Sequence, residues 1–99
     1  MIKYKTHNDG IPFIGGCLQG YIEADYKEIK KLFGLPTIGD GYKLDAEWCI
    51  LFEDGSSARI YNWKNGRNYN GRNGTPKTKI RNWNIGGENQ DAFVHIRVI

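Results

Sequence analysis

The sequence predicts an α+β fold: a small antiparallel β-sheet, a meander around a central hairpin, packed with one or two short helices. The first observation behind this prediction is that Trp48, Ile50 and Phe52 alternate with other residues, which is the period of a half-buried strand. The second is the acidic-Gly segment 53–55, because Asp-Gly suits the backbone angles of a tight hairpin turn. A further apolar run leads away from this turn to Trp63, so we expect a hairpin over residues 46–63.

The neighbours of this hairpin follow from the same kind of pattern. Cys49 and Leu51, on the reverse face of the first strand, are also apolar, which is typical of a central strand that is covered on both faces. Residues 79–87 alternate in a similar way and predict a third strand of the meander, which we expect Gly86 and Gly87 to end.

Residues 25–33 carry the clearest helix signal. Asp25 stands three residues before Glu28, the spacing of a capping box at a helix start. Gly34, with Pro36 just beyond it, is a typical helix stop. Four apolar residues between these signals share one helix face: Tyr26, Ile29, Leu32 and Phe33.

The two ends of the chain have weaker patterns. Residues 1–13 predict a brief strand and a turn, and residues 14–24 predict a strand interrupted by glycines. Glycine inside a strand marks a bulge or a close approach of the backbone, and we favour packing against a helix over a ligand contact. The C-terminal segment from about Asn89 predicts a short helix, although its β-branched residues would also suit a strand.

Length and composition predict one globular domain over residues 1–99. The chain has no apolar run that could cross a bilayer and no signal-peptide pattern at its start, so we expect a cytoplasmic protein. Cys17 and Cys49 lack metal or redox spacing and are expected to be small buried residues without a disulfide. His7 and His95 have no carboxylates at ligand spacing. We therefore expect no metal and no cofactor.

The charge of the chain is distributed unevenly. The net charge is +3, from fourteen basic and eleven acidic residues. Residues 56–87 contain seven of the basic residues and none of the acidic ones, so this segment carries +7 and the rest of the chain −4. A patch of one sign on a small domain attracts anions such as nucleic acid, nucleotides or an acidic protein face.

The candidate site is the basic loop that follows the hairpin, residues 64–79, with its flanks. Its Gly and Asn content predicts a loop without regular structure, and unstructured connections longer than about 12 residues are uncommon unless they are functional or disordered. Arginine and lysine suit phosphate oxygens, and tyrosine and tryptophan offer faces for base stacking. We expect Trp63 and Trp83 to be packing residues rather than stacking platforms. The candidate binding residues are Arg59, Tyr61, Lys64, Arg67, Tyr69, Arg72, Lys77, Lys79 and Arg81.

The loop also has interpretations other than ligand binding. It lacks the spacing of a P-loop and of a dinucleotide fingerprint. A long solvated loop whose charges aid solubility is the plain alternative. No nucleophile and base stand in a catalytic pattern, since Glu53 and Asp54 are explained by the turn and Glu47 by a strand start. We therefore expect a binding protein and not an enzyme.

Several segments resemble small phage-encoded proteins of about this size. They are FGLP at 33–36, GDGYKLDAEW at 39–48, the FEDG turn, IYNWK at 60–64 and WNIGG at 83–87, within a likeness that covers roughly residues 20–87. Phage proteins of this kind include anti-defence factors, among them anti-CRISPR proteins and sponges of cyclic nucleotide immune signals. The resemblance implies a non-catalytic inhibitor and carries no role for any single residue.

Together these observations predict a phage counter-defence inhibitor that acts by stoichiometric binding through the basic loop. A DNA mimic is excluded because it needs an acidic surface, and here the concentrated charge is basic. The expected partner is either a bacterial immune effector with an acidic or nucleic-acid-bearing surface or its phosphorylated signal molecule, met in the host cytosol. An RNA- or DNA-binding module is the alternative. A homo-oligomer with a site between subunits is left open.

Overall fold

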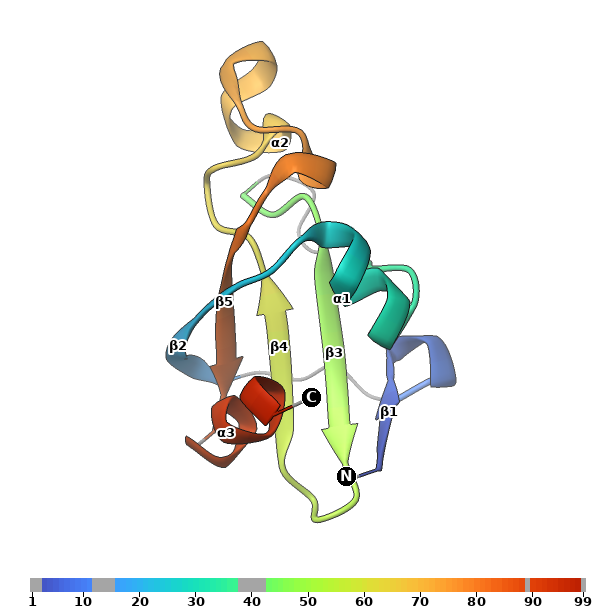
Figure 1. Cartoon of the computed structure of the whole chain (residues 1–99). Helices are drawn as coiled ribbons and strands as arrows, with labels where there is room; N and C mark the ends of the chain where they lie inside the picture. Colours follow the sequence, from blue (N-terminus) through green and yellow to red (C-terminus); the bar gives the residue numbers. More distant parts are fainter. Residues whose placement is uncertain (1–2, 12–15, 38–42, 89, 99) are drawn as a thin grey trace.

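The fold was analysed in a computed structural model, which describes residues 3–11, 16–37, 43–88 and 90–98 (Figure 1). One five-stranded antiparallel sheet has the strand order β1-β3-β4-β5-β2. The strands are β1 Tyr4–Thr6, β2 Cys17–Glu23, β3 Glu47–Phe52, β4 Ser57–Tyr61 and β5 Asn82–Gly87. The helices are α1 Tyr26–Phe33, α2 Arg67–Asn70 and α3 Gln90–Val98, with 3-10 turns η1 His7–Asp9, η2 Gly71–Asn73 and η3 Lys77–Lys79. The α+β prediction is confirmed.

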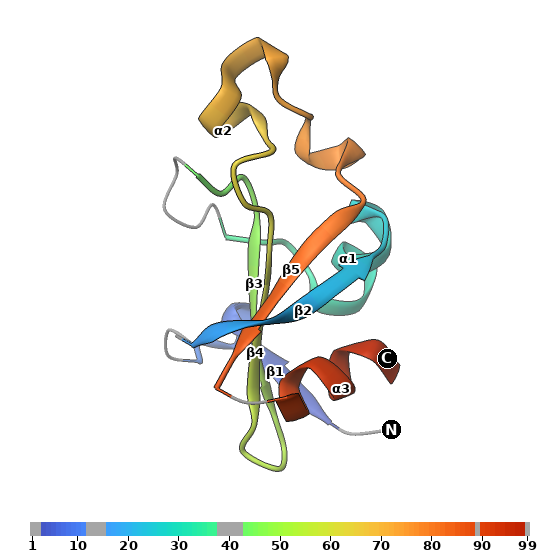
Figure 2. The same cartoon turned by 90° about the vertical axis from the view of Figure 1, so that its left-hand side faces the viewer.

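The predicted hairpin is β3 and β4, and β5 continues it as the expected meander. Trp48, Ile60 and Ile85 lie opposite one another on these three strands and face the same side of the sheet. Helices α1 and α3 cover that side, as the edge-on view in Figure 2 shows. Because the apolar residues alternate along each strand, one face of the sheet supplies the core, and Trp48 and Trp83 at its centre are fully buried with ring centroids 5.3 Å apart.

Helix α1 begins and ends where the sequence predicts. Asp25 and Glu28 form the reciprocal capping box, and Gly34 ends the helix with a φ of 83°. Tyr26, Ile29 and Phe33 are buried against the sheet. The expectation that the Asp25 segment forms a core-facing helix is confirmed for these three residues, but Leu32 is 45% exposed because its position lies at the margin of their stripe.

The glycine-containing segment is strand β2, which pairs with β5 through a bulge between Leu18 and Gly20. A Cβ atom on Gly20 would lie 2.7 Å from the Phe93 ring, so the glycine lets α3 pack directly on the strand. This confirms the interpretation of packing against a helix. Helix α3 also settles the C-terminal segment as helical rather than extended.

Two details of the strand predictions are wrong. The third strand ends at Gly87 as expected, but it begins at Asn82 instead of residue 79, because residues 77–79 form the 3-10 turn η3. Cys17 is exposed, because it begins the edge strand β2; Cys49 on central β3 is buried as expected, and neither thiol is in a disulfide. Residues 14, 15 and 39–42 of the predicted segments lie outside the described residues.

The molecule is elongated, with extents of 41 × 23 × 22 Å. Its long axis follows the strands, and α2 lies beyond their ends, where β4 leaves the sheet and β5 enters it (Figures 1 and 2). In the described part of the chain, no helix combines the length and apolar character that crossing a membrane requires.

Candidate functional site

The basic loop, residues 64–79, protrudes together with its flanking residues 62 and 63 from the end of the sheet where β4 leaves and β5 returns (Figures 1 and 2). The prediction that it holds no regular structure is wrong, since it contains α2, η2 and η3. Asparagine side chains make these turns possible by bonding to the backbone: Asn70 Nδ2 donates to the carbonyls of Lys64 at 2.7 Å and Gly66 at 3.3 Å. The loop is therefore a folded projection.

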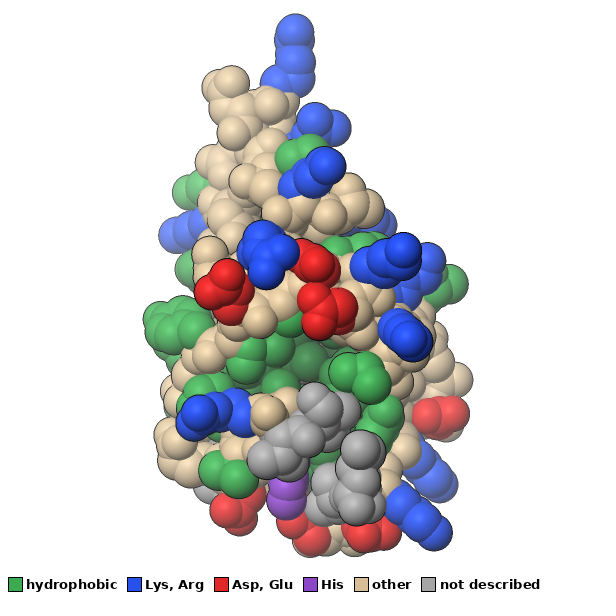
Figure 3. Space-filling model, viewed as in Figure 1, with side chains coloured by type: hydrophobic (Ala, Val, Ile, Leu, Met, Phe, Trp, Pro, Cys, Tyr) green, Lys and Arg blue, Asp and Glu red, His purple; other side chains and the backbone are tan. Residues whose placement is uncertain are grey.

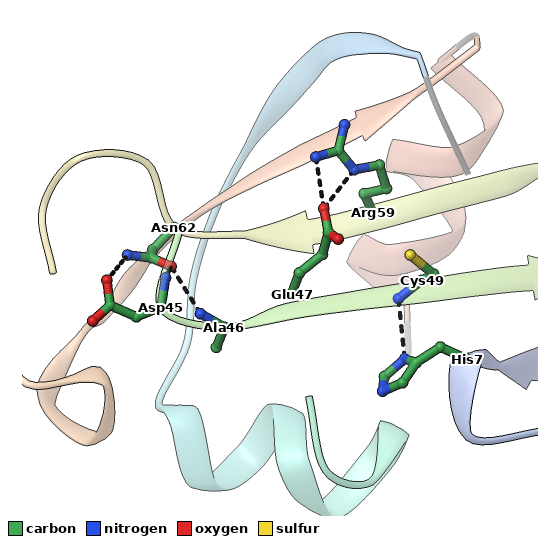
Figure 4. Close-up of polar contacts among 7 residues, drawn as sticks. All are labelled: His7, Asp45, Ala46, Glu47, Cys49, Arg59 and Asn62. Atoms are coloured by element: carbon green, nitrogen blue, oxygen red, sulfur yellow. Dashed lines mark hydrogen bonds and ion pairs between the residues drawn. The ribbon is translucent and has the colours of Figure 1, made fainter. Parts of the chain in front are cut away.

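A buried amide–carboxylate pair braces the base of the loop (Figure 4). Asn62 is fully buried, and its Oδ1 accepts from the backbone N–H groups of Asp45 at 2.7 Å and Ala46 at 3.1 Å. Its Nδ2 donates to Asp45 Oδ1 and to Asn65 Oδ1, each at 3.0 Å. The other Asp45 oxygen accepts from the backbone N–H of Asn68 at 3.2 Å. Asp45 and Asn62 thus join the start of β3 to the whole first half of the loop.

Gly66 has a structural reason for being glycine. A Cβ atom at this position would lie 1.9 Å from Asp45 Oδ1, so the backbone approaches the carboxylate as closely as only glycine allows. A loop glycine can let backbone N–H groups approach an external anion. At Gly66 the anion that the backbone meets is the chain's own buried Asp45.

Two of the predicted arginines are paired with carboxylates of the chain itself. On β4, Arg59 donates from Nε to Glu47 Oε2 at 2.8 Å, and its Nη2 lies 2.6 Å from the same oxygen (Figure 4). Tyr61 lies beside it, with the guanidinium carbon 4.6 Å from the ring centroid. Arg81 donates to Asp25 and lies 3.7 Å from Glu23. The structure therefore separates Arg59, Tyr61 and Arg81 from the basic loop.

The other predicted cations are exposed on the loop: Lys64, Arg67, Arg72, Lys77 and Lys79. Among the described residues, no carboxylate forms an ion pair with any of these five side chains. Figure 3 shows Lys and Arg side chains spread over this end of the molecule, with the nearest acidic side chains lower down, over α1 and β2. Asp45 is the acidic residue beneath the loop, and it is buried.

The two tryptophans that flank the loop differ in burial. Trp83 is a core residue, as expected, and its Nε1 donates to the Ala24 carbonyl at 3.0 Å. Trp63 is 46% exposed, and Lys43 and Lys64 lie near its ring. Lys43 was missed by the sequence analysis, because it is twenty positions away from Trp63 and nothing in its local pattern indicates that the two meet.

A second polar cluster lies at the opposite end of the sheet. The pKa of Asp54 is lowered from 3.8 to about 2, chiefly because the Ser56 hydroxyl and then the Ser56 N–H donate to it, and His95 adds a further hydrogen bond. His95 Nε2 lies 2.7 Å from Asp54 Oδ2. The carboxylate thus lies between Ser56 and His95, which is the wrong order for a Ser–His–Asp relay. This cluster fastens α3 to the hairpin turn.

A groove of about 380 Å³ lies between α1 and α3, and Figure 3 shows its apolar lining. Its lining includes three apolar residues, Ile29, Phe33 and Ile60. It also includes three charged residues, Glu23, Glu28 and Arg97. None of the residues that line it belongs to the basic loop. Among the described residues, no group of three or more His, Cys, Asp or Glu side chains is placed to hold a metal ion.

The fold and this site define a small α+β protein with a braced, protruding cationic loop. No protein-family model matches the sequence, and the searches of curated proteins and of solved structures found no match.

Proposed function

We propose that the protein is a non-enzymatic binding protein that engages an anionic partner, stoichiometrically, through the basic loop. The observation that supports this most directly is the set of five exposed cations on one folded projection: Lys64, Arg67, Arg72, Lys77 and Lys79. Cations grouped in this way repel one another, and a partner with negative charge relieves that repulsion while releasing its own counterions.

The shape of the loop supports a macromolecular partner over a small nucleotide. A small ligand is held best in a concave site that surrounds most of its surface. The basic loop is a projection, and such a shape suits an extended phosphate backbone or a negatively charged groove. We therefore favour nucleic acid, or a protein surface that carries it, as the partner class.

The resemblance to phage proteins gives this binding a biological setting. We propose that the protein inhibits a bacterial immune effector in the host cytosol by occupying its acidic or nucleic-acid-bearing surface. Capture of a phosphorylated signal molecule is the second version of this role. A general RNA- or DNA-binding module remains the alternative function.

The central experiment compares two double variants with the same change in charge. We expect Arg67→Glu with Arg72→Glu to remain folded, since both side chains are exposed, and to lose binding to a labelled oligonucleotide. Lys5→Glu with Lys31→Glu, on β1 and α1, changes the net charge equally but leaves the loop intact, so it should retain most of the affinity. Fluorescence anisotropy measures both, and thermal melting checks folding. Equal affinities for the two variants would overturn the proposal.

Two further measurements distinguish inhibition of an immune effector from capture of a signal molecule. A panel of cyclic nucleotides should raise the melting temperature only if the protein sequesters a signal molecule, because a ligand that binds the folded state stabilises it. Native mass spectrometry of the protein from infected cells should show a co-purifying effector if the partner is a protein. A nucleotide-induced shift without such an effector would favour the signal sponge.

A further inference from the structure

Two aromatic rings and two lysines meet on one side of the basic loop. We call Lys43, Trp63, Lys64 and Tyr69 the aromatic–lysine cluster. The Lys64 ammonium lies 5.6 Å from the Trp63 ring centroid and 5.5 Å from that of Tyr69, and the Lys43 ammonium lies 5.3 Å from the Trp63 centroid. Because one ammonium group is near both rings, the rings belong to a single small surface.

The rings of this cluster are exposed in a protein that buries its other tryptophans. Trp63 is 46% exposed and Tyr69 is 37% exposed, whereas Trp48 and Trp83 are fully buried. The core does not need Trp63, since β4 ends two residues earlier and Trp63 is not among the core residues. The half-exposed Trp63 ring therefore forms an aromatic surface beside the two ammonium groups that lie over it.

The backbone of the cluster is held in an unfavourable conformation. Lys64 has a φ of 59°, and it is the one non-glycine residue with positive φ in the described part of the chain. Its N–H donates to the Lys43 carbonyl at 2.8 Å, which brings the two lysine-bearing segments together. The left-handed region is strained for lysine and free of strain for glycine, so this position carries a side chain at a cost in stability.

We infer that the aromatic–lysine cluster is a stacking site for an unpaired base of single-stranded nucleic acid, with its two lysines contacting the flanking phosphates. This inference rests on the proposed function, which it makes specific. An aromatic face can stack only on a base whose own face is open, and a duplex hides these faces within its stack. Cations alone would bind single strands and duplexes through the same phosphates. The exposed rings therefore point to the single strand.

The remaining loop cations extend this site along a strand. Arg67, in α2, and Arg72, in η2, follow Trp63 on the same short loop, and both side chains are exposed. If Lys43 and the five loop cations all contact phosphates at roughly −0.7 each, the logarithm of the affinity should fall with the logarithm of salt concentration with a slope near −4.2. A much flatter slope together with strong binding would indicate that stacking dominates.

The test uses three probes: a short oligothymidylate, a duplex of equal length and inorganic polyphosphate, which has charge but no bases. We expect the full chain to bind oligothymidylate more tightly than the duplex or polyphosphate. The oligothymidylate should quench the fluorescence of exposed Trp63, because Trp48 and Trp83 are shielded in the core. Trp63→Leu should lower the affinity for oligothymidylate by about 5-fold to 140-fold and leave polyphosphate binding unchanged.

Two further variants serve as controls. Trp63→Phe keeps a ring and should retain most of the affinity while it loses the quenching signal. Lys64→Gly relieves the backbone strain, so it should melt at the same or a higher temperature and still bind oligothymidylate more weakly.

The outcomes separate the inference from the proposed function. If Trp63→Leu binds oligothymidylate as the unmodified chain does, or if the duplex binds as tightly as the single strand, the stacking site is refuted. In that case, loss of binding in the Arg67→Glu and Arg72→Glu double variant would still uphold the loop as an anion site. Failure of the unmodified chain to bind any of the three probes at low salt would refute both the stacking site and nucleic acid as the partner class.

Discussion

The sheet and the basic loop of this protein are held together in different ways. In the sheet, apolar side chains from three strands and two helices pack into one cluster centred on Trp48 and Trp83. At the base of the loop, Asn62 makes four hydrogen bonds to Asp45, Ala46 and Asn65 while fully buried. Apolar burial is non-directional and tolerates adjustment, whereas a buried amide must find each partner at the correct angle.

This difference explains how a segment rich in glycine and asparagine can present cations in a defined arrangement. The loop has no apolar core of its own, so its order depends on the polar brace at its base. The brace also places the Asp45 carboxylate beneath a surface of positive charge, where it offsets part of the repulsion among the cations. The sheet provides the stability, and the hydrogen bonds of Asn62 and Asp45 attach the loop to the sheet.

The largest expected effect concerns the apolar half of this comparison. Trp83→Ala removes a fully buried ring and leaves a cavity beside Trp48, so it should lower the free energy of unfolding by about 3–5 kcal/mol. Trp63→Ala, at a half-exposed ring, should change it by about 0.5 kcal/mol or less. Urea denaturation followed by circular dichroism measures both. Similar losses in the two variants would show that Trp63 belongs to the core after all.

A substitution in the polar brace should lower the free energy of unfolding less than one in the apolar core, and its effect should be confined to the basic loop. Asn62→Ala leaves the Asp45 carboxylate and two backbone N–H groups without their buried partner, at a cost of about 1–3 kcal/mol. We expect hydrogen exchange to accelerate across the basic loop while the central strands remain protected. Asn73→Ala, at an exposed position of the same loop, is the matched control and should alter neither stability nor exchange. A uniform loss of protection across sheet and loop would contradict the separation of the two regions.

The smallest expected effect lies at the end of the sheet remote from the loop. Since the folded-state pKa of Asp54 is lowered to about 2 from 3.8, its ionised form favours the folded state. This contribution is complete above pH 3.8 and disappears as the pH falls towards 2. The difference in urea midpoint between the unmodified chain and Asp54→Asn should therefore shrink over that range. A difference that stays constant from pH 6 to about pH 2 would show that Asp54 gains nothing from Ser56 and His95.

The sequence by itself determined the hairpin, helix α1 and the meander, because these elements depend on local signals. Strand alternation, the Asp-Gly turn and the Asp25–Glu28 capping box each lie within a few residues of one another. The exposed loop cations followed from the same kind of reasoning, since a segment without acidic residues can be read directly from the chain.

Only the tertiary structure decided which cations are available and how the loop is built. Arg81 meets Asp25 across 56 positions, and Asn62 meets Asp45 across 17. The register of β3 and β4 brings Glu47 to Arg59, and the hydrogen bond from the Lys64 N–H to the Lys43 carbonyl brings a lysine to Trp63. Buried apolar residues recur with the period of the helix or strand, so they can be predicted from neighbouring positions in the sequence. Ion pairs and directional hydrogen bonds join particular atoms from distant positions, and these partners meet only once the chain has folded.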